Sequence, residues 1–463
     1  MPTPDAQGDM QITPMPELAN YIATALTNPL PEEVVEKAKH HLLDTLSSMV
    51  SGSRMLAGER AIAFVKAQGQ SEPQAALAGT SLRTTAINAA MANGMFAHAD
   101  ETDDSHAPSL THPGCGVVPA VLACAELWHR GGTDMLRAMV LGYDVCARLT
   151  MSLDAYAFRE AGHSSHTFGP NFGAAAAAGA LAGVEARQAR YLMSYAAQQA
   201  SGVACWMRDK DHVEKSFDFG GMGARNGVTA AIMVHSGCTG VDDVFSGQRC
   251  FYDAYGDQPD RGALGRELGV RYEILNTAIK RWTVGSPIQA PLDALDHLIR
   301  THRFGADDVL AVEVRIPHQM VLTVNDRDMP EICLQHVLAT LIVDGTMGFA
   351  SAHDRPRMND PTVLAVRERI ALVGDDGLSR LMPSRQGIVE VTLKDGRRLR
   401  EHTLAVRGTP ANPMTRKELK EKSMELIAPI LGKAQGERLV EQVWTLERIE
   451  DARELARLLS PAS

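Results

Sequence analysis

The stretch Phe172-Gly-Ala-Ala-Ala-Ala-Ala-Gly-Ala-Leu-Ala-Gly-Val184 decides the architecture that this sequence predicts. It is apolar, but it consists almost entirely of alanine and glycine, and it is shorter than the ~20 residues that a membrane span needs. Side chains this small allow neighbouring backbones to approach closely. We therefore expect a helix in a soluble protein that packs tightly against another helix.

Helical spacing of apolar residues continues on both sides of this stretch. Between Pro31 and Gly52 apolar residues recur at three- and four-residue steps, after an acidic first turn and before a glycine stop, which predicts an amphipathic helix. Similar patterns cover the ranges 15–27, 83–98, 116–130, 134–151, 170–184, 187–203 and 223–236. Because β-type alternation is hard to find before residue 300, we expect the first part of the chain to be all-helical.

The pattern changes between Thr283 and Asp395. Val309–Pro317 and Gly387–Leu393 alternate, and Lys394-Asp-Gly-Arg397 is typical of a hairpin turn. Helical patterning returns at 415–432 and 436–459. The sequence therefore predicts a mainly α protein with a smaller α+β domain: a large all-helical domain over 1–275 together with 410–463, and an α+β lid over 280–405.

Composition narrows the class of protein. A chain of 463 residues is too long for one core at ~100–200 residues per domain. Lys and Arg number 46 against 56 for Asp and Glu, and no basic run stands out, which disfavours nucleic acid or a membrane as partner. The seven cysteines lack a CxxC pair, and the first segment lacks the basic and apolar regions of a signal peptide. We therefore expect reduced thiols and a cytoplasmic location.

The densest polar cluster is His98-Ala-Asp-Glu-Thr-Asp-Asp-Ser-His106, which is followed by His112 at the expected start of an apolar helix. One interpretation is a metal-dependent hydrolase, whose ligands would be His98, Asp100, Asp104 and His106. A second is a general acid–base site, in which carboxylates set the tautomer and the pKa of His112. A third is a solvated loop in which Asp and Ser cap turns.

Two further segments carry groups that can do chemistry. In Gly162-His-Ser-Ser-His-Thr-Phe-Gly-Pro170, His163 and His166 lie three residues apart, next to small residues ahead of the Ala-rich helix. Lys215 and Lys280 are isolated lysines in apolar or glycine-rich surroundings. No Walker loop is present and no GxGxxG follows a strand, so nucleotide binding has no support.

Taken in order, these segments resemble the MmgE/PrpD family, which includes 2-methylcitrate dehydratase, cis-aconitate decarboxylase and iminodisuccinate epimerase. The resemblance runs over nearly the whole chain, including Ile332-Cys-Leu-Gln-His and the region of Pro413-Met-Thr415. It implies an enzyme without metal or other cofactor that acts on a small-molecule carboxylate. It also implies a helical domain with an α+β lid, an active site in the cleft between them, and a homodimer.

Carried over by position, the family's pocket residues correspond to Glu101, Asp103, Asp104, Ser105, His112, His163, Lys215 and Lys280. The sequence departs from the family pattern at three places. Asp100 directly before Glu101 makes the pocket carboxylate ambiguous, Asp218 stands where a histidine is frequent, and His166 stands where a small residue is common. The tricarboxylate substrates of the family therefore do not transfer directly.

The function that we expect is a cofactor-independent lyase, a dehydratase (hydro-lyase) of a hydroxylated di- or tricarboxylic acid. His112 would be the base and His163 the acid, with the reverse assignment open, while Glu101 and Asp104 orient the imidazoles or protonate a leaving group. Lys215 and Lys280 would stabilise the enediolate. The further residues that we expect to bind the substrate are Asp100, Asp103, Ser105, His166, Arg208 and Asp218.

Other functions remain open from the sequence. A decarboxylase or an epimerase would use the same scaffold, because the same carbanion can arise by loss of carbon dioxide or be reprotonated on its other face. The metal-dependent hydrolase is an alternative of another class, as is a scaffold protein without activity.

The lysines lead to a prediction about metal content. Because Lys215 and Lys280 already supply the positive charge that an enolate requires, we expect elemental analysis of the purified protein to find no stoichiometric zinc or iron. Metal in stoichiometric amount, lost together with activity on chelation, would transfer support to the hydrolase.

Overall fold

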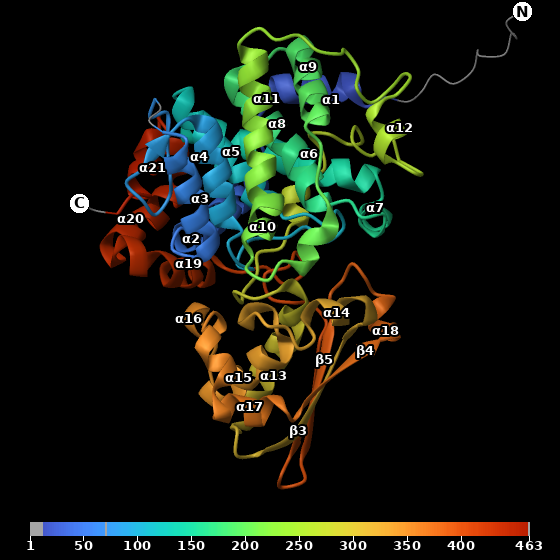
Figure 1. Ribbon diagram of the computed structural model, residues 1–463, viewed down its shortest axis with the longest axis vertical. Coiled ribbons are helices and arrows are strands. Elements are labelled where there is room, and N and C mark those ends of the chain that lie inside the picture. The colour runs from blue at the N-terminus through green and yellow to red at the C-terminus, as the bar shows by residue number, and fades with distance from the viewer. Residues whose placement is uncertain (1–12, 70–71, 462–463) are drawn as a thin grey trace, which may run out of the picture.

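The structure is a computed structural model that describes residues 13–69 and 72–461. Residues 1–12 and 462–463, at the ends of the expected helical domain, and residues 70–71 lie outside the described part. Two bodies are visible in Figure 1, a larger helical one and a smaller one that contains a sheet, with irregular segments between them. This mainly helical fold with a smaller α+β lid confirms the predicted fold class.

The larger body has one continuous apolar core, which runs from Met15 to Ile279 and again from Met414 to Leu459. Its first helices are α1 (Met15–Thr24), α2 (Glu32–Gly52), α3 (Leu56–Ala67), α4 (Ala86–Ala97), α5 (Pro113–Leu127), α6 (Gly132–Ser152), α7 (Ala155–Glu160), α8 (Ser165–Ala182), α9 (Ala186–Gln198), α10 (Val213–Ser216), α11 (Met222–His235) and α12 (Phe251–Tyr255). A short ribbon joins β1 (Ala75–Ala76) and β2 (Arg83–Thr84). The chain returns to this body at its end as α19 (Arg416–Leu431), α20 (Lys433–Trp444) and α21 (Arg453–Leu458), with α19 packed against α2 (Figure 1).

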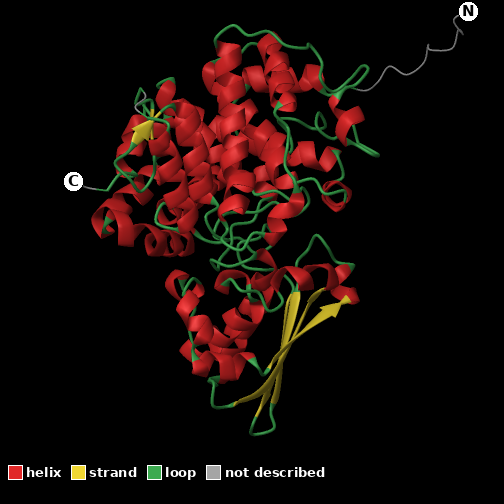
Figure 2. Ribbon diagram, viewed as in Figure 1, coloured by secondary structure: helices red, strands yellow, loops and turns green. Residues whose placement is uncertain are grey.

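The lid has a core of its own, from Trp282 to Leu393. Its elements are α13 (Gln289–His302), β3 (Val309–Pro317), α14 (Val321–Val324), α15 (Leu334–Asp344), α16 (Phe349–Ala352), α17 (Pro361–Arg367), β4 (Ile370–Asp375), α18 (Asp376–Ser379), β5 (Gly387–Leu393) and β6 (Arg398–Thr403). The sheet order is β4-β3-β5-β6, with β3 and β4 parallel and the other pairs antiparallel. Figure 1 and Figure 2 show α13, α15 and α17 on one side of this sheet, while the short helices α14 and α18 lie at its upper end. Val312, Val314 and Ile316 of β3 are buried at alternate positions, as the pleat requires.

Several elements differ from the sequence-based expectation. The strand β6 is an edge strand whose residues RLREHT are mostly polar, so it lacks the alternation by which β3 and β5 are recognised. The expected helix 436–459 is interrupted between α20 and α21. The helix α8 begins at Ser165 instead of residue 170, because Pro170 is accommodated inside it. A Cβ on Gly116 would lie 2.5 Å from Pro170 Cβ, so α5 packs directly on this proline.

Close packing of small residues holds the helices around α8 together. A Cβ built on Gly173 of α8 would lie 2.4 Å from the carbonyl oxygen of Gly142 in α6, and one on Gly227 of α11 would lie 2.5 Å from Ala174 Cβ. The glycines therefore allow a backbone approach that any side chain would prevent.

Over the described residues, the structure has no helix with the length and apolarity that crossing a membrane requires.

This packing leads to a prediction for stability. We expect Gly173→Ala to lower the free energy of unfolding by ~1–3 kcal/mol, because the added methyl group forces α6 and α8 apart. The matched control is Gly305→Ala in the lid, where a Cβ meets nothing within 4 Å. Denaturant unfolding of the two variants checks this. Equal loss of stability in both would contradict close packing as the reason for the glycine.

Candidate active site

A buried loop between α4 and α5 carries the acidic residues. Thr85 caps α4 by accepting a hydrogen bond from the Asn88 backbone N–H at 3.3 Å. Pro113 begins α5, where a residue without an N–H group fits the first turn. The loop between these helices, His98–His112, is buried at nearly every position. Its charged groups therefore need partners inside the protein.

Asp104 anchors this loop to the helical domain. Its carboxylate accepts hydrogen bonds from the Tyr143 hydroxyl at 2.6 Å and from the Gly114 backbone N–H at 3.0 Å, and it lies 2.8 Å from His41 Nδ1. These three partners come from α6, α5 and α2, and Asp104 does not line the cleft. The imidazole that Asp104 orients is His41, which the sequence reasoning did not single out.

Asp103 does not line the cleft, but its carboxylate contacts the imidazoles of His98 and His112. Its carboxylate lies 2.9 Å from His98 Nδ1 and 3.2 Å from His112 Nδ1, and Lys280 Nζ is 3.7 Å away. Burial would raise the pKa of Asp103, but His98, His112 and Lys280 hold it well below its usual range. Since Nδ1 of His112 is occupied by Asp103, its Nε2 is the nitrogen available to the cleft.

Glu101 is the acidic loop residue that lines the cleft, and it is surrounded by cations. It pairs with Lys215 Nζ, lies 3.3 Å from His212 Nε2, and has Lys280 Nζ at 3.4 Å. Lys280 also donates to the Glu101 backbone oxygen at 2.7 Å. Burial would raise the pKa of Glu101, but Lys215 and Lys280 hold it well below its usual range. Glu101 is therefore ionised at neutral pH, and it cannot protonate a leaving group in this state.

Asp100, the neighbour that made the pocket carboxylate ambiguous, turns toward the lid. It accepts hydrogen bonds from the Thr102 backbone N–H at 2.9 Å and the Thr102 hydroxyl at 2.6 Å. Its other contact is His353 Nε2 of the lid at 2.8 Å. Burial would lower the pKa of His353, but Asp100 raises it to about 9. This ion pair therefore connects the His98–His112 loop to the lid.

The two candidate histidines before the Ala-rich helix lie in different places. His166 is in the first turn of α8 and lines the cleft, with its ring 5.3 Å from that of His112 and stacked on Phe219 at 3.8 Å. His163 precedes the helix, stacks on Phe158 at 4.4 Å, and is not among the residues that line the cleft. The early start of α8 explains this, because it puts His166 on the helix and leaves His163 in the preceding loop.

Lys215 and Phe219 reach the cleft from an irregular turn. α10 continues into a π-helical segment, Phe217–Gly221, and such segments are frequent at functional sites. Lys215 Nζ lies 5.1 Å from the centre of the Phe219 ring and 5.6 Å from that of Trp206. Asp218 of the same segment turns away and accepts a hydrogen bond from Ser164 Oγ at 2.5 Å. Burial raises the pKa of Asp218 to about 6.

The cleft itself lies between the two domains and has a volume of about 140 Å³. From the helical domain it is lined by Glu101, Leu110, His112, Arg159, His166, Trp206, Met207, Asp209, Lys215 and Phe219. From the lid it is lined by Gly285, Ser286, Pro287, Met320, Leu322, Thr323, Arg327, Met329, Ile332 and Arg385. It therefore combines titratable groups of the helical domain with a lid wall that is largely apolar apart from Arg327 and Arg385.

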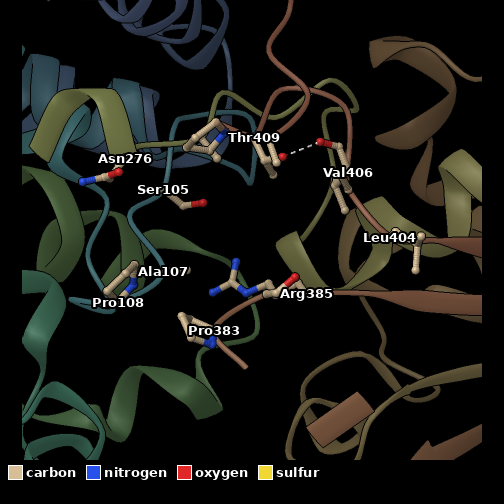
Figure 3. A pocket seen from close by; sticks show the side chains of 14 residues that line it. Ser105, Ala107, Pro108, Asn276, Pro383, Arg385, Leu404, Val406 and Thr409 are labelled. Atoms are coloured by element: carbon tan, nitrogen blue, oxygen red, sulfur yellow. Dashed lines mark hydrogen bonds between the residues drawn. The ribbon is translucent and has the colours of Figure 1, made fainter. Parts of the chain in front are cut away.

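Three other predicted residues lie outside the lining of this cleft. Lys280 is buried behind the carboxylates, and Arg208 is exposed. Ser105 lines an adjacent cavity of about 280 Å³, which is shown in Figure 3. The sequence reasoning also missed cleft residues, namely Arg159, Trp206, Phe219, Arg327 and Arg385. Arg159 lies in the short helix α7, Trp206 and Phe219 lie in 3₁₀ and π-helical turns, and the two lid arginines lie in loops. No spacing or motif in the sequence distinguishes any of them.

The four ligands of the metal alternative do not come together. Asp100 and Asp104 have the separate partners described above, and His106 lies against Ser109 at 2.7 Å and Glu273 at 3.4 Å. In the described part of the chain, the groups close enough to hold an ion are His98 with Asp103 and Cys115, and His98 with Glu101 and His212. Lysines already compensate the carboxylates in both groups. Because His98, Asp100, Asp104 and His106 do not lie together, the prediction of these four as a ligand set was wrong.

Comparisons with known proteins identify the domains that the chain matches and several of its relatives. Residues 16–263 match the MmgE/PrpD N-terminal domain and residues 282–446 match the MmgE/PrpD C-terminal domain. A cis-aconitate decarboxylase-like protein of Aspergillus oryzae is 24% identical and covers 96% of both chains. The cis-aconitate decarboxylase of Mus musculus is 24% identical over 96% of this chain and 93% of its own. That of Homo sapiens is 25% identical over 94% and 92%, respectively.

The contact between Asp100 and His353 predicts a pH dependence of stability. Because the pKa of His353 is raised to about 9, against about 6.5 when unfolded, its stabilisation is complete below pH 6.5 and is lost as the pH rises through 9. We expect His353→Gln to be less stable than the parent by up to ~3 kcal/mol at pH 6. The difference should shrink by pH 10. Urea unfolding across this range measures it, and a difference independent of pH would refute the ion pair.

Proposed function

The chain belongs to the MmgE/PrpD family, and we propose that it is a lyase that removes carbon dioxide from an unsaturated di- or tricarboxylic acid without a cofactor. One observation carries this proposal: His112, His166 and Lys215 line the same cleft. Asp103 holds His112 in place there. The curated relatives are lyases named for decarboxylation, which favours this reaction over the dehydration that the sequence led us to expect.

Decarboxylation breaks the bond between a carbon atom and a carboxylate, and the electron pair stays on that carbon while carbon dioxide leaves. When the pair is delocalised into a neighbouring unsaturated carboxylate, negative charge collects on its oxygens. A fixed ammonium group stabilises this charge better in a water-poor cleft than in bulk water. Lys215 supplies such a group, since Glu101 and the rings of Trp206 and Phe219 hold it in place.

The carbanion must then receive a proton, and His112 is the residue suited to deliver it. Its Nδ1 lies against the ionised carboxylate of Asp103, and this contact leaves Nε2 facing the cleft. Burial, followed by the charges of His112 and His98, holds the pKa of His166 well below its usual range. His166 is therefore neutral at neutral pH, and its role is to hydrogen-bond the substrate.

The apolar wall protects the carbanion from other protons. Leu110 of the helical domain and Met320 and Ile332 of the lid line the same cleft as His112. Side chains of this kind exclude water, so the proton comes from the positioned imidazole. Since Met320 and Ile332 belong to the lid, the reaction depends on a closed cleft.

Dehydration is the second candidate, and the pair of imidazoles favours it. The rings of His112 and His166 are 5.3 Å apart on one cleft. A neutral His166 could take the proton next to a carboxylate, while protonated His112 gives its proton to the departing hydroxyl, so that an alkene and water form. His163 has no place in this scheme, because its ring does not line the cleft.

The two reactions are separated by their products. We would incubate the purified protein with cis-aconitate and, separately, with citrate and 2-methylcitrate, and follow the carbon signals by NMR. Decarboxylation releases carbon dioxide and, in D₂O, places one deuteron on the product carbon. Dehydration removes the hydroxyl-bearing carbon signal and keeps every carboxylate. If neither product forms from any of the three acids, the proposed reaction is wrong.

The mechanism predicts different effects for two histidine variants. We expect His112→Asn to lower turnover by ~10²–10⁴-fold with little change in KM, because it removes the proton donor but leaves the anion-binding groups. The matched control is His163→Asn, which should retain turnover and the wild-type pH profile, since His163 packs on Phe158. Steady-state kinetics across pH decides this. Loss of activity in His163→Asn with retention in His112→Asn would reverse the two roles.

A further inference from the structure

The lid contributes two arginines to the cleft, and neither has an anionic partner among the described residues. Arg385 lies between α18 and β5, and Arg327 follows α14. Over the described ranges, neither guanidinium group has a carboxylate oxygen within 4.0 Å. The Nε atom of Arg385 is buried and makes no hydrogen bond. Such a group is costly in a protein interior unless something pairs with it.

The charge balance of the cleft also favours an anionic ligand. Its described lining residues include four cationic side chains, Arg159, Lys215, Arg327 and Arg385, against two carboxylates, Glu101 and Asp209. The chain as a whole has a net charge of −10. Glu101 is already paired with Lys215. The excess positive charge therefore lies on the arginines, and the lid supplies most of it.

The position of Arg385 defines where an anion would sit. It lines both the cleft that contains His112 and the adjacent cavity of about 280 Å³. Figure 3 shows its guanidinium group extending into the space between Ser105, Pro108 and Pro383. Glu101 is near enough to affect the pKa of Arg385, which burial lowers, but too far away to pair with it. An anion bound here therefore lies at the boundary of the two cavities.

We propose that Arg385 binds a second carboxylate of the substrate, one that does not react. This inference rests on the proposed function and extends it, because it requires a substrate with at least two carboxylates. The reacting end lies near Lys215 and His112, and the other end reaches the lid. A guanidinium group recognises a carboxylate through two parallel hydrogen bonds, which fixes the orientation of the substrate as well as its charge.

Binding of unreactive acids tests the subsite without any turnover. The probes are tricarballylate, which has three carboxylates on a saturated chain, and butyrate, which has one. We expect the wild-type protein to bind tricarballylate, and Arg385→Gln to weaken this binding ~10-fold or more, as measured by calorimetry. Butyrate should bind equally to both proteins. The matched control is Arg438→Gln, a change at an exposed arginine of α20 outside both cavities, which should bind tricarballylate like wild type.

The unliganded variants separate binding from a structural role. Because Arg385 makes no ion pair in the protein, Arg385→Gln should unfold at the same temperature as wild type or higher. The stabilisation by tricarballylate should be reduced in the variant. Arg385→Lys, which keeps the charge but loses the paired geometry, should bind with intermediate affinity and serves where the glutamine variant does not fold.

The outcomes distinguish this subsite from the proposed reaction. Unchanged tricarballylate binding in Arg385→Gln, or in Arg385→Lys should the first not fold, overturns the subsite even where decarboxylation occurs. Absence of tricarballylate binding to the wild-type protein overturns it as well. Arg385-dependent binding supports the subsite even if none of the tested acids is converted, and in that outcome only the proposed reaction fails.

Discussion

Lys280 connects the parts on which the candidate site depends. It lies where the chain crosses from the helical core, which ends at Ile279 in this part of the sequence, to the lid core, which begins at Trp282. Its ammonium group donates to the backbone oxygen of Glu101 and lies close to the carboxylates of Glu101 and Asp103. Two ionised carboxylates in one buried loop would repel each other and would be poorly solvated without such a cation. The same lysine therefore permits the acidic loop to be buried and ties it to the segment that leads into the lid.

The acidic loop works because each carboxylate has a different partner. Asp104 attaches the loop to helices of the larger domain, Asp103 holds two imidazoles, and Glu101 faces the cleft with Lys215. Asp100 contacts the lid through His353. Four acidic residues within five positions thus serve four purposes, and removing the partner of any one of them would leave a buried charge without compensation. This is the physical reason that a sequence so acidic forms an ordered loop instead of a solvated one.

The sequence predicted the helical domain, the lid and the acidic loop, because apolar periodicity and local charge density are visible along the chain. It could not distinguish His163 from His166, since that choice depends on where α8 begins, and Pro170 hides this start. In the fold Pro170 packs against Gly116 of α5, a contact that is not local in sequence. Lys280 was expected to touch the substrate, whereas its neighbours are the carboxylates of the loop. Arg385 carries no signal at all, because a lone arginine in an irregular segment resembles any surface cation until the fold brings it to the cleft.

The uncompensated positive charge of the cleft lies mainly on the lid, so the site is complete only when the lid and the helical domain meet. On the helical side, Glu101 compensates Lys215, so this wall alone attracts an anion only weakly. The arginines of the lid carry the uncompensated charge, while His112 and its partner Asp103 belong to the helical domain. In the proposed mechanism, proton transfer and anion attraction therefore reside in different domains and act on one molecule only when the cleft is closed. A substrate with two carboxylates bridges the two walls and lowers the free energy of the closed state, whereas a monocarboxylate contacts one wall and has no such differential affinity. Selectivity for longer acids then follows from closure itself, without a dedicated group to exclude the shorter ones.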